Sequence, residues 1–159
     1  MITEPFDLKH NQCCANLGVK FCSKNALVDA LLNYIYQETD KNYTILYSLD
    51  GYDEISLTSE FKMISNHEEE LLSPEKIKFP RLIAEDLRGG TNVEESVKIF
   101  MNILKGNGTI AQNAVVAVNS GYALRKIFPE KNLPDCFEMA QNSLQEGKAL
   151  KVLQTLLTL

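Results

Sequence analysis

The pattern of apolar and polar positions predicts strands in the first half of the chain and helices in the second. From Asn25 onward, apolar residues recur three and four positions apart, which predicts a helix that packs one face on a sheet, formed by Leu27, Ala30, Leu31, Tyr34 and Ile35. The run from Tyr43 to Ser48 is mostly apolar, as expected for a buried parallel strand after a crossover helix. Alternating positions predict further strands at residues 55–58, 61–64 and 70–72. Glu68 to Glu70 are expected at a solvated edge or turn.

A capping signal precedes the first helix of the second half. Either Thr91 with Glu94 or Asn92 with Glu95 can form a capping box there. Helical spacing then predicts one apolar face, made of Val93, Val97, Phe100, Met101 and Leu104. Gly106 is expected to end this helix.

Three more helices are predicted after it. Thr109 can cap the first of them, whose middle at residues 114–118 is apolar on all sides and is therefore expected to be buried. Pro129 ends that helix, and the next one opens near Pro134. Gly147 breaks the chain again before a final amphipathic helix. Helices that follow a strand-rich region indicate an α/β protein.

The break after the Tyr43 to Ser48 strand contains three carboxylates. Asp50-Gly51 is a turn dipeptide, so Asp53 and Glu54 are expected in a loop or just after it. In a regular strand two neighbouring side chains point to opposite faces, whereas at an irregular strand end both can face one ion. Oxygen ligands of this kind suit Mg²⁺, which binds one or two carboxylates and leaves other positions to water and phosphate. The alternative is a pair of solvated turn carboxylates.

Four segments share their order and approximate spacing with one known family: residues 50–58, 87–90, 114–124 and 143–150. This set resembles the anthranilate phosphoribosyltransferases, which are nucleoside phosphorylase-like phosphoribosyltransferases. The resemblance covers roughly Asn25 to the C-terminus. It implies that the fold is the C-terminal part of a phosphoribosyltransferase catalytic domain, with a mixed sheet covered by helices. It also implies that Asp53 and Glu54 are metal ligands.

The N-terminal segment matches that family less completely. Leu8-Lys9-His10-Asn11 is similar to its Lys-His-Gly-Asn signature without the glycine, which implies Lys9, His10 and Asn11 as substrate-binding residues. An exposed or loosely packed side chain is the alternative for His10. The family's Ser/Gly-rich loop, its diphosphate-binding Gly-rich loop and its N-terminal helical domain have no counterpart in this sequence. The resemblance therefore implies a contracted remnant at residues 1–24 and the C-terminal part of the catalytic domain at residues 25–159.

The activity that the resemblance implies is transfer of a 5-phosphoribosyl group from phosphoribosyl diphosphate to anthranilate, with Mg²⁺, in tryptophan biosynthesis. Two alternatives stay open. The chain is a shortened form that is weak or inactive alone, or works only with another subunit; or it is an interaction module that uses its exposed helical surface. A pyrimidine nucleoside phosphorylase shares the architecture but matches residues 50–54 less closely.

Composition and charge exclude several other classes. The chain has 159 residues with 16 Lys and Arg against 21 Asp and Glu, a net charge of −5, which gives no electrostatic footprint for nucleic acid. No stretch approaches the roughly 20 apolar residues that span a bilayer, and no signal pattern begins the chain, so a cytoplasmic location is expected. The four cysteines have neither zinc spacing nor a disulfide pattern, and reduced thiols are expected.

A final expectation concerns association. An apolar strand such as Tyr43 to Ser48 needs cover on both faces, and the absence of neighbouring elements would leave a strand edge or helix face in water. Self-association through an exposed sheet edge is therefore expected.

Overall fold

The computed structural model describes residues 19–21 and 26–159, and it describes side chains from residue 32 onward. The chain separates into two compact units, residues 1–78 and residues 79–159. The boundary expected between residues 24 and 25 lies outside the described residues and stays a prediction.

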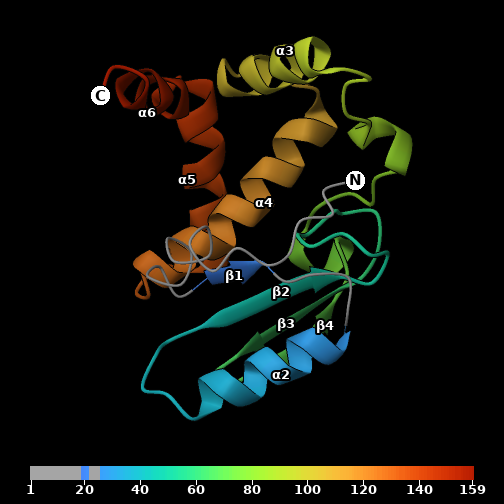
Figure 1. The fold of residues 1–159 in the computed structure, drawn as a ribbon, viewed down its shortest axis with the longest axis vertical. Helices are drawn as coiled ribbons and strands as arrows, with labels where there is room; N and C mark the ends of the chain where they lie inside the picture. The colour runs from blue at the N-terminus through green and yellow to red at the C-terminus, as the bar shows by residue number, and fades with distance from the viewer. Residues whose placement is uncertain (1–18, 22–25) are drawn as a thin grey trace. The chain divides into compact units, whose positions relative to one another are not determined.

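The first unit is built on a mixed four-stranded sheet. Its strands are β1 (Val19–Phe21), β2 (Thr44–Ser48), β3 (Phe61–Ser65) and β4 (Glu69–Leu72), which lie in the order β1-β2-β3-β4. Helix α2 (Ala26–Gln37) joins β1 to β2, which run parallel, whereas β2–β3 and β3–β4 are antiparallel (Figure 1). A crossover helix between parallel strands and a mixed sheet were both predicted, and both are confirmed.

Helix α2 packs on the sheet through different residues from those predicted. Tyr43, Ile45 and Ile64 form a buried cluster, and Leu32 and Tyr36 of α2 pack against it. The rings of Tyr36 and Tyr43 stack with centroids 5.2 Å apart, and the Tyr43 hydroxyl donates to Asn33 Oδ1 at 2.7 Å.

The predicted contact residues Tyr34 and Ile35 are instead 65% and 50% exposed. The prediction for these two residues was therefore wrong, because apolar side chains occur nearly all round this helix and only the sheet selects which ones are buried. The side chains of Leu27, Ala30 and Leu31 lie outside the described residues.

Residues 55–58 do not form the predicted strand. The backbone is irregular here, and Leu57 has a left-handed φ of 62° although its side chain is fully buried. Side-chain hydroxyls satisfy the backbone groups that a strand would pair, since Ser48 Oγ accepts from the Ser56 N–H at 3.0 Å and Ser56 Oγ accepts from the Thr58 N–H at 3.2 Å. Serine and threonine side chains compete with sheet pairing in this way.

Strand β4 is one edge of the sheet as far as the structure describes it, and it is acidic. Glu69 pairs with Lys62 of β3, and Glu70 pairs with Lys76 at 3.3 Å. The solvated edge predicted from the glutamates is confirmed. Charged side chains on a short edge strand oppose pairing with another chain.

The second unit consists of helices joined by short loops. After the 3₁₀ turn η2 (Ala84–Leu87) come α3 (Val93–Leu104), α4 (Ile110–Ile127), α5 (Leu133–Gln145) and α6 (Lys148–Leu156). All four α-helices were predicted. Thr109 and Gln112 form a capping box at α4, and Asn132 caps α5.

Asn92 caps α3 by accepting from the Glu95 N–H at 2.9 Å. The Glu95 carboxylate accepts from the Thr91 N–H and hydroxyl, and these two contacts lower its pKa.

The core of this unit lies between α4 and α5. Gly121 of α4 faces the Phe137 ring of α5, and a Cβ at Gly121 would lie 2.2 Å from Phe137 Cδ1. Further buried residues come from both helices, namely Ala114, Ala117, Val118, Tyr122, Ala140 and Leu144. The predicted burial of α4 is therefore confirmed on this face.

The apolar face predicted for α3 is present, but it is exposed. Val93, Val97 and Phe100 are 81%, 53% and 50% exposed, and no residue of α3 is buried. The amphipathic spacing is present, but it specifies only that a face is apolar, and the elements around a helix decide whether that face is covered.

Candidate functional site

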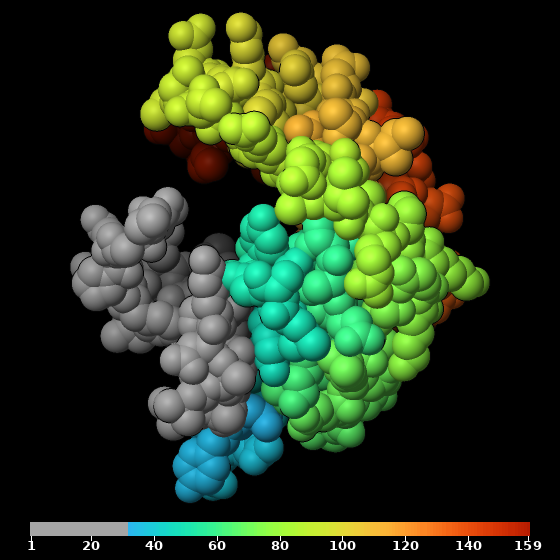
Figure 2. All heavy atoms as spheres, turned by 90° about the vertical axis from the view of Figure 1, so that its right-hand side faces the viewer, coloured from blue at the N-terminus to red at the C-terminus, as the bar shows by residue number. Residues whose placement is uncertain are grey.

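The turn that follows β2 places Asp53 and Glu54 on the surface of the first unit. The Gly51 N–H donates to Ser48 O at 3.3 Å, and Gly51 has a φ of 88° that favours glycine. The Ser48 N–H donates to Tyr52 O at 3.2 Å, so the turn closes directly on the end of the strand. In Figure 2 the turquoise atoms around residues 50–60 lie on the surface that faces the viewer. Asp53 and Glu54 are both exposed.

The two carboxylates influence one another. Partial desolvation raises the pKa of the Glu54 carboxyl above its ordinary value, and the negative charge of Asp53 raises it further. A positive ion between the two groups would relieve this repulsion, because an opposite charge favours the ionised form.

The donor set fits Mg²⁺ but is incomplete by itself. Among residues 32–159, whose side chains are described, no group of three or more His, Cys, Asp or Glu side chains is arranged to hold a metal. Asp53 and Glu54 offer hard oxygen donors, which suits an ion that takes one or two protein carboxylates and obtains the rest from water and phosphate. Metal binding by this pair stays a prediction.

Asp50 has a different role from the other two carboxylates. Its Oδ2 accepts from the hydroxyl of Ser56 at 3.1 Å and from the hydroxyl of Thr58. Ser48 and Ser56 are buried, and Ser56 Oγ lies 3.2 Å from Ser48 Oγ. We name Ser48, Asp50, Ser56 and Thr58 the hydroxyl cluster.

Sequence reasoning missed the hydroxyl cluster. Its signal was serines at buried positions: Ser48 is the last residue of an apolar strand, and Ser56 lies between Ile55 and Leu57, which are fully buried. Buried hydroxyls nearly always have hydrogen-bond partners, so polar residues in an apolar run indicate a specific network.

The other predicted binding residues belong to the N-terminal segment. Lys9, His10 and Asn11 lie outside the described residues, and their role in substrate binding stays a prediction.

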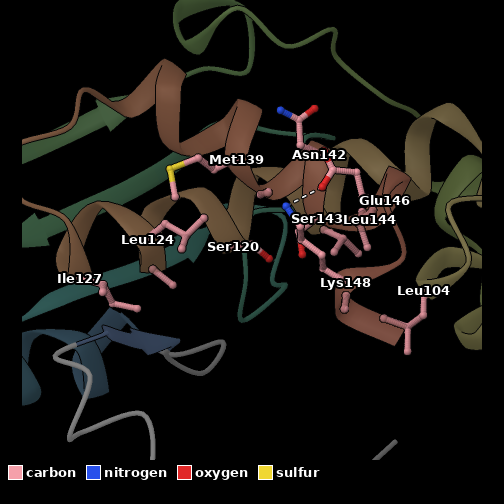
Figure 3. A pocket seen from close by; sticks show the side chains of 14 residues that line it. Leu104, Ser120, Leu124, Ile127, Met139, Asn142, Ser143, Leu144, Glu146 and Lys148 are labelled. Carbon is pink, nitrogen blue, oxygen red and sulfur yellow. Dashed lines mark ion pairs between the residues drawn. The ribbon is translucent and has the colours of Figure 1, made fainter. Parts of the chain in front are cut away.

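The second unit contains a separate apolar groove of about 700 Å³. Figure 3 shows Leu124, Ile127 and Met139 at one end of it and Leu104 at the other, beside the ion pair between Glu146 and Lys148 at 2.5 Å. Most of the lining side chains are aliphatic or small, with a few polar groups such as Ser120. Such a lining can bury apolar surface, and its charged groups, Glu146 and Lys148, are paired with one another.

The cysteine that the structure describes is not a reactive group. Cys136 is a free thiol and fully buried in α5, and burial raises its pKa. A thiol of this kind behaves as a small apolar side chain. The expectation of a reduced thiol is confirmed for Cys136.

Comparison with known proteins settles the family. A family model described as "Glycosyl transferase family, a/b domain" matches residues 15–150. The chain belongs to this glycosyl transferase family.

The glycosyl transferase relatives of this chain include anthranilate phosphoribosyltransferases. The chain is 41% identical over 129 residues to the enzyme of that name from Bacteroides thetaiotaomicron, covering 81% of this chain and 39% of the relative. It is 50% identical over 119 residues to the one from Christiangramia forsetii, covering 73% and 35%. The resemblance found from the four motifs is confirmed. The chain spans less than two fifths of the length of these relatives.

A solved structure supports the fold. The crystal structure of anthranilate phosphoribosyltransferase from Thermus thermophilus matches with a TM-score of 0.73 at 21% identity, covering 83% of this chain and 40% of that one. The predicted fold class, part of an α/β phosphoribosyltransferase domain, is confirmed. Within the part of this glycosyl transferase chain that the structure describes, no helix is long and apolar enough to cross a membrane.

Proposed function

We propose that this chain supplies the metal-binding turn of an anthranilate phosphoribosyltransferase, with Asp53 and Glu54 as the protein ligands of Mg²⁺. The observation that carries the proposal is the exposed pair of neighbouring carboxylates on an irregular turn at the end of β2. The relatives named anthranilate phosphoribosyltransferase support it, because the fold alone would not identify a reaction.

The reaction proposed is transfer of the 5-phosphoribosyl group from phosphoribosyl diphosphate to the amine of anthranilate, as part of tryptophan biosynthesis. Mg²⁺, when bound, would neutralise charge that grows on the departing diphosphate. The chain's own contribution is to present Asp53 and Glu54 together from a turn anchored on β2. We propose Lys9, His10 and Asn11 as further substrate-binding residues on the basis of their sequence signature alone.

The alternative is that this chain is a shortened form that is inactive or needs another subunit. The sequence matches the Bacteroides thetaiotaomicron enzyme over 39% of that enzyme's length. Catalysis of group transfer depends mainly on positioning both substrates, so a chain with only one part of the site is expected to lose most of its rate. Both proposals include the same metal-binding turn.

A binding experiment tests the turn, and an assay tests the activity. Isothermal titration calorimetry with Mg²⁺ and diphosphate would compare the parent with a variant that carries Asp53→Asn and Glu54→Gln. A matched control carries Glu85→Gln and Asp86→Asn, which removes the same charge from another exposed acidic pair. We expect binding by the parent and the control and loss of binding by the first variant. Equal binding by all three would remove the site from the proposal.

The fluorescence of anthranilate reports the transfer reaction directly. We expect little or no loss of anthranilate when the isolated chain is given phosphoribosyl diphosphate and Mg²⁺. Turnover in the ordinary enzyme range of about 1–10³ per second would show that this chain is sufficient for catalysis and would refute the shortened-form alternative.

We also propose a cytoplasmic location and self-association. The biosynthetic relatives support the first. Exposed apolar residues on α6 and at its C-cap, namely Val152, Leu156 and Leu157, support the second, whereas the acidic edge of β4 opposes pairing through that strand. Light scattering would distinguish a monodisperse monomer from an assembly.

A further inference from the structure

We infer that Ser48, Asp50 and Ser56 are positioning residues that hold Asp53 and Glu54 in the geometry needed for a divalent cation. The inference rests on the metal-binding turn proposed above. None of the three side chains is proposed to touch the ion. They act through the backbone that presents the two carboxylates.

The Ser48 side chain connects the turn to β2 through hydrogen bonds to the backbone on both sides of Ile55. Its hydroxyl donates to Glu54 O at 2.9 Å and accepts from the Ser56 N–H at 3.0 Å. One buried side chain therefore fixes the carbonyl of Glu54 itself and the amide two residues later. Because Ser48 belongs to β2, which pairs with strands on both sides, the contact ties the turn to a rigid element.

Each hydrogen bond of the hydroxyl cluster can be assigned a donor and an acceptor without conflict. Each hydroxyl has one proton and can accept more than one hydrogen bond. The Ser48 proton is used on Glu54 O, so Ser48 Oγ acts as acceptor toward the Ser56 N–H. Ser56 accepts from the Thr58 N–H, and its own proton points to Asp50 Oδ2 at 3.1 Å. The Asp50 carboxylate, which only accepts, is the end point of this chain of donors.

The cluster also holds an unfavourable backbone conformation. Asp53 and Glu54 lie between two residues with positive φ, Gly51 at 88° and Leu57 at 62°. A residue with a side chain keeps such a φ only when its surroundings impose it. The hydrogen bond from the Thr58 N–H to Ser56 Oγ spans Leu57 and supplies that constraint, together with burial of the leucine.

The constraint matters because neighbouring carboxylates do not converge by default. In extended chain, side chains of adjacent residues diverge, so Asp53 and Glu54 can share an ion only while the irregular turn persists. Partners that orient metal ligands without touching the metal typically change metal affinity about 10–100-fold when removed. Since Ser48 acts through the main chain, we expect an effect of about tenfold, at the low end of that range.

The test measures Mn²⁺ binding in the presence of diphosphate by electron paramagnetic resonance, which reports free and bound Mn²⁺ without any catalytic assay. Ser48→Ala is expected to bind Mn²⁺ about tenfold more weakly than the parent. The matched control is Ser65→Ala, which removes a hydroxyl that accepts from the Glu68 N–H at 3.2 Å in another turn of the same unit. Loss of a hydroxyl hydrogen bond would lower the stability of both variants. Only Ser48→Ala is expected to weaken Mn²⁺ binding and to change the spectrum of the bound ion.

A second variant covers the case in which Ser48→Ala fails to fold. Asp50→Asn keeps the size of the side chain and one acceptor oxygen but presents an NH₂ group to a hydroxyl of the cluster. It is expected to weaken Mn²⁺ binding and to speed hydrogen exchange of the Ser56 and Thr58 amides. Binding like that of the parent in folded Ser48→Ala and Asp50→Asn would overturn the inference and leave the proposed site intact. If the parent shows no Mn²⁺ binding that depends on Asp53 and Glu54, both the inference and the proposed metal-binding turn are overturned.

Discussion

The contact between Gly121 and Phe137 allows the stability of the second unit to be tested with a single methyl group. In Gly121→Ala the added Cβ would lie 2.2 Å from Phe137 Cδ1 and 3.3 Å from Phe137 Cα. Real Cβ atoms do not approach other atoms as closely as the first of these distances, so either the ring or the helix must move. Phe137 is 6% exposed, and its ring has little room.

The neighbours of Phe137 decide how far it can move. Phe79 contacts it edge-on with ring centroids 5.0 Å apart, and Tyr122 also contacts it edge-on, with centroids 5.9 Å apart. Alanine is favoured over glycine inside a helix by about 1 kcal/mol. Overpacking a close-packed core costs about 1–3 kcal/mol. We expect the steric cost to exceed the helix preference, so that Gly121→Ala lowers the free energy of unfolding by about 1 kcal/mol.

Urea unfolding followed by circular dichroism measures this difference. Gly89→Ala is the matched control, because nothing lies within 4 Å of a Cβ at that position. Both substitutions reduce the entropy of the unfolded chain, so their difference leaves the helix preference of alanine and the contact with Phe137. In a Phe137→Leu background the cost of Gly121→Ala should shrink. An alanine variant as stable as the parent, or a cost unchanged by Phe137→Leu, would refute the reasoning.

The remaining predictions concern single side chains. Thr109→Ala removes the cap of α4 and should lower the free energy of unfolding by about 1 kcal/mol, measured by urea titration. Lys78 has a left-handed φ of 64°, which costs a residue with a side chain roughly 1–2 kcal/mol. Lys78→Gly removes this cost, but the greater entropy of glycine in the unfolded chain offsets part of the gain, so the free energy of unfolding should stay unchanged or rise by up to about 1 kcal/mol. The pKa of the Glu54 carboxyl is raised in the folded state, so the contribution of this group to stability is lost as the pH rises above the ordinary glutamate pKa near 4.5. Glu54→Gln should therefore be more stable than the parent at pH 7, and the two proteins should have equal stability in acid. The pKa of Glu95 is lowered by Thr91, so the sign is opposite: Glu95→Gln should be less stable than the parent at pH 7, with the difference disappearing as pH falls below about 4.5. Thermal unfolding from pH 3 to 8 measures both, and the same sign for the two glutamate variants would contradict the assignment.

Local sequence determined most of the secondary structure. Capping residues and glycines depend on backbone groups within a few positions, so Thr109 and Gly147 marked helix ends correctly. Strands β2 and β3 were recognisable because their apolar runs are bounded by turn residues. The turn glycine also placed Asp53 and Glu54 in a loop, whereas their predicted role as metal ligands came from the resemblance to anthranilate phosphoribosyltransferases.

The tertiary structure decided which apolar faces are covered and how the turn is held. The α2 contact through Tyr36 rather than Tyr34, and the exposure of Phe100 on α3, depend on which elements lie alongside each helix, and helical spacing contains no information about that. Ser48 and Ser56 are eight positions apart and meet only because the turn folds back on β2. The sequence alone placed two carboxylates in a loop, whereas the long-range hydrogen bonds beneath them determine the shape of that loop, because hydroxyl groups acquire partners only once the backbone has closed around them.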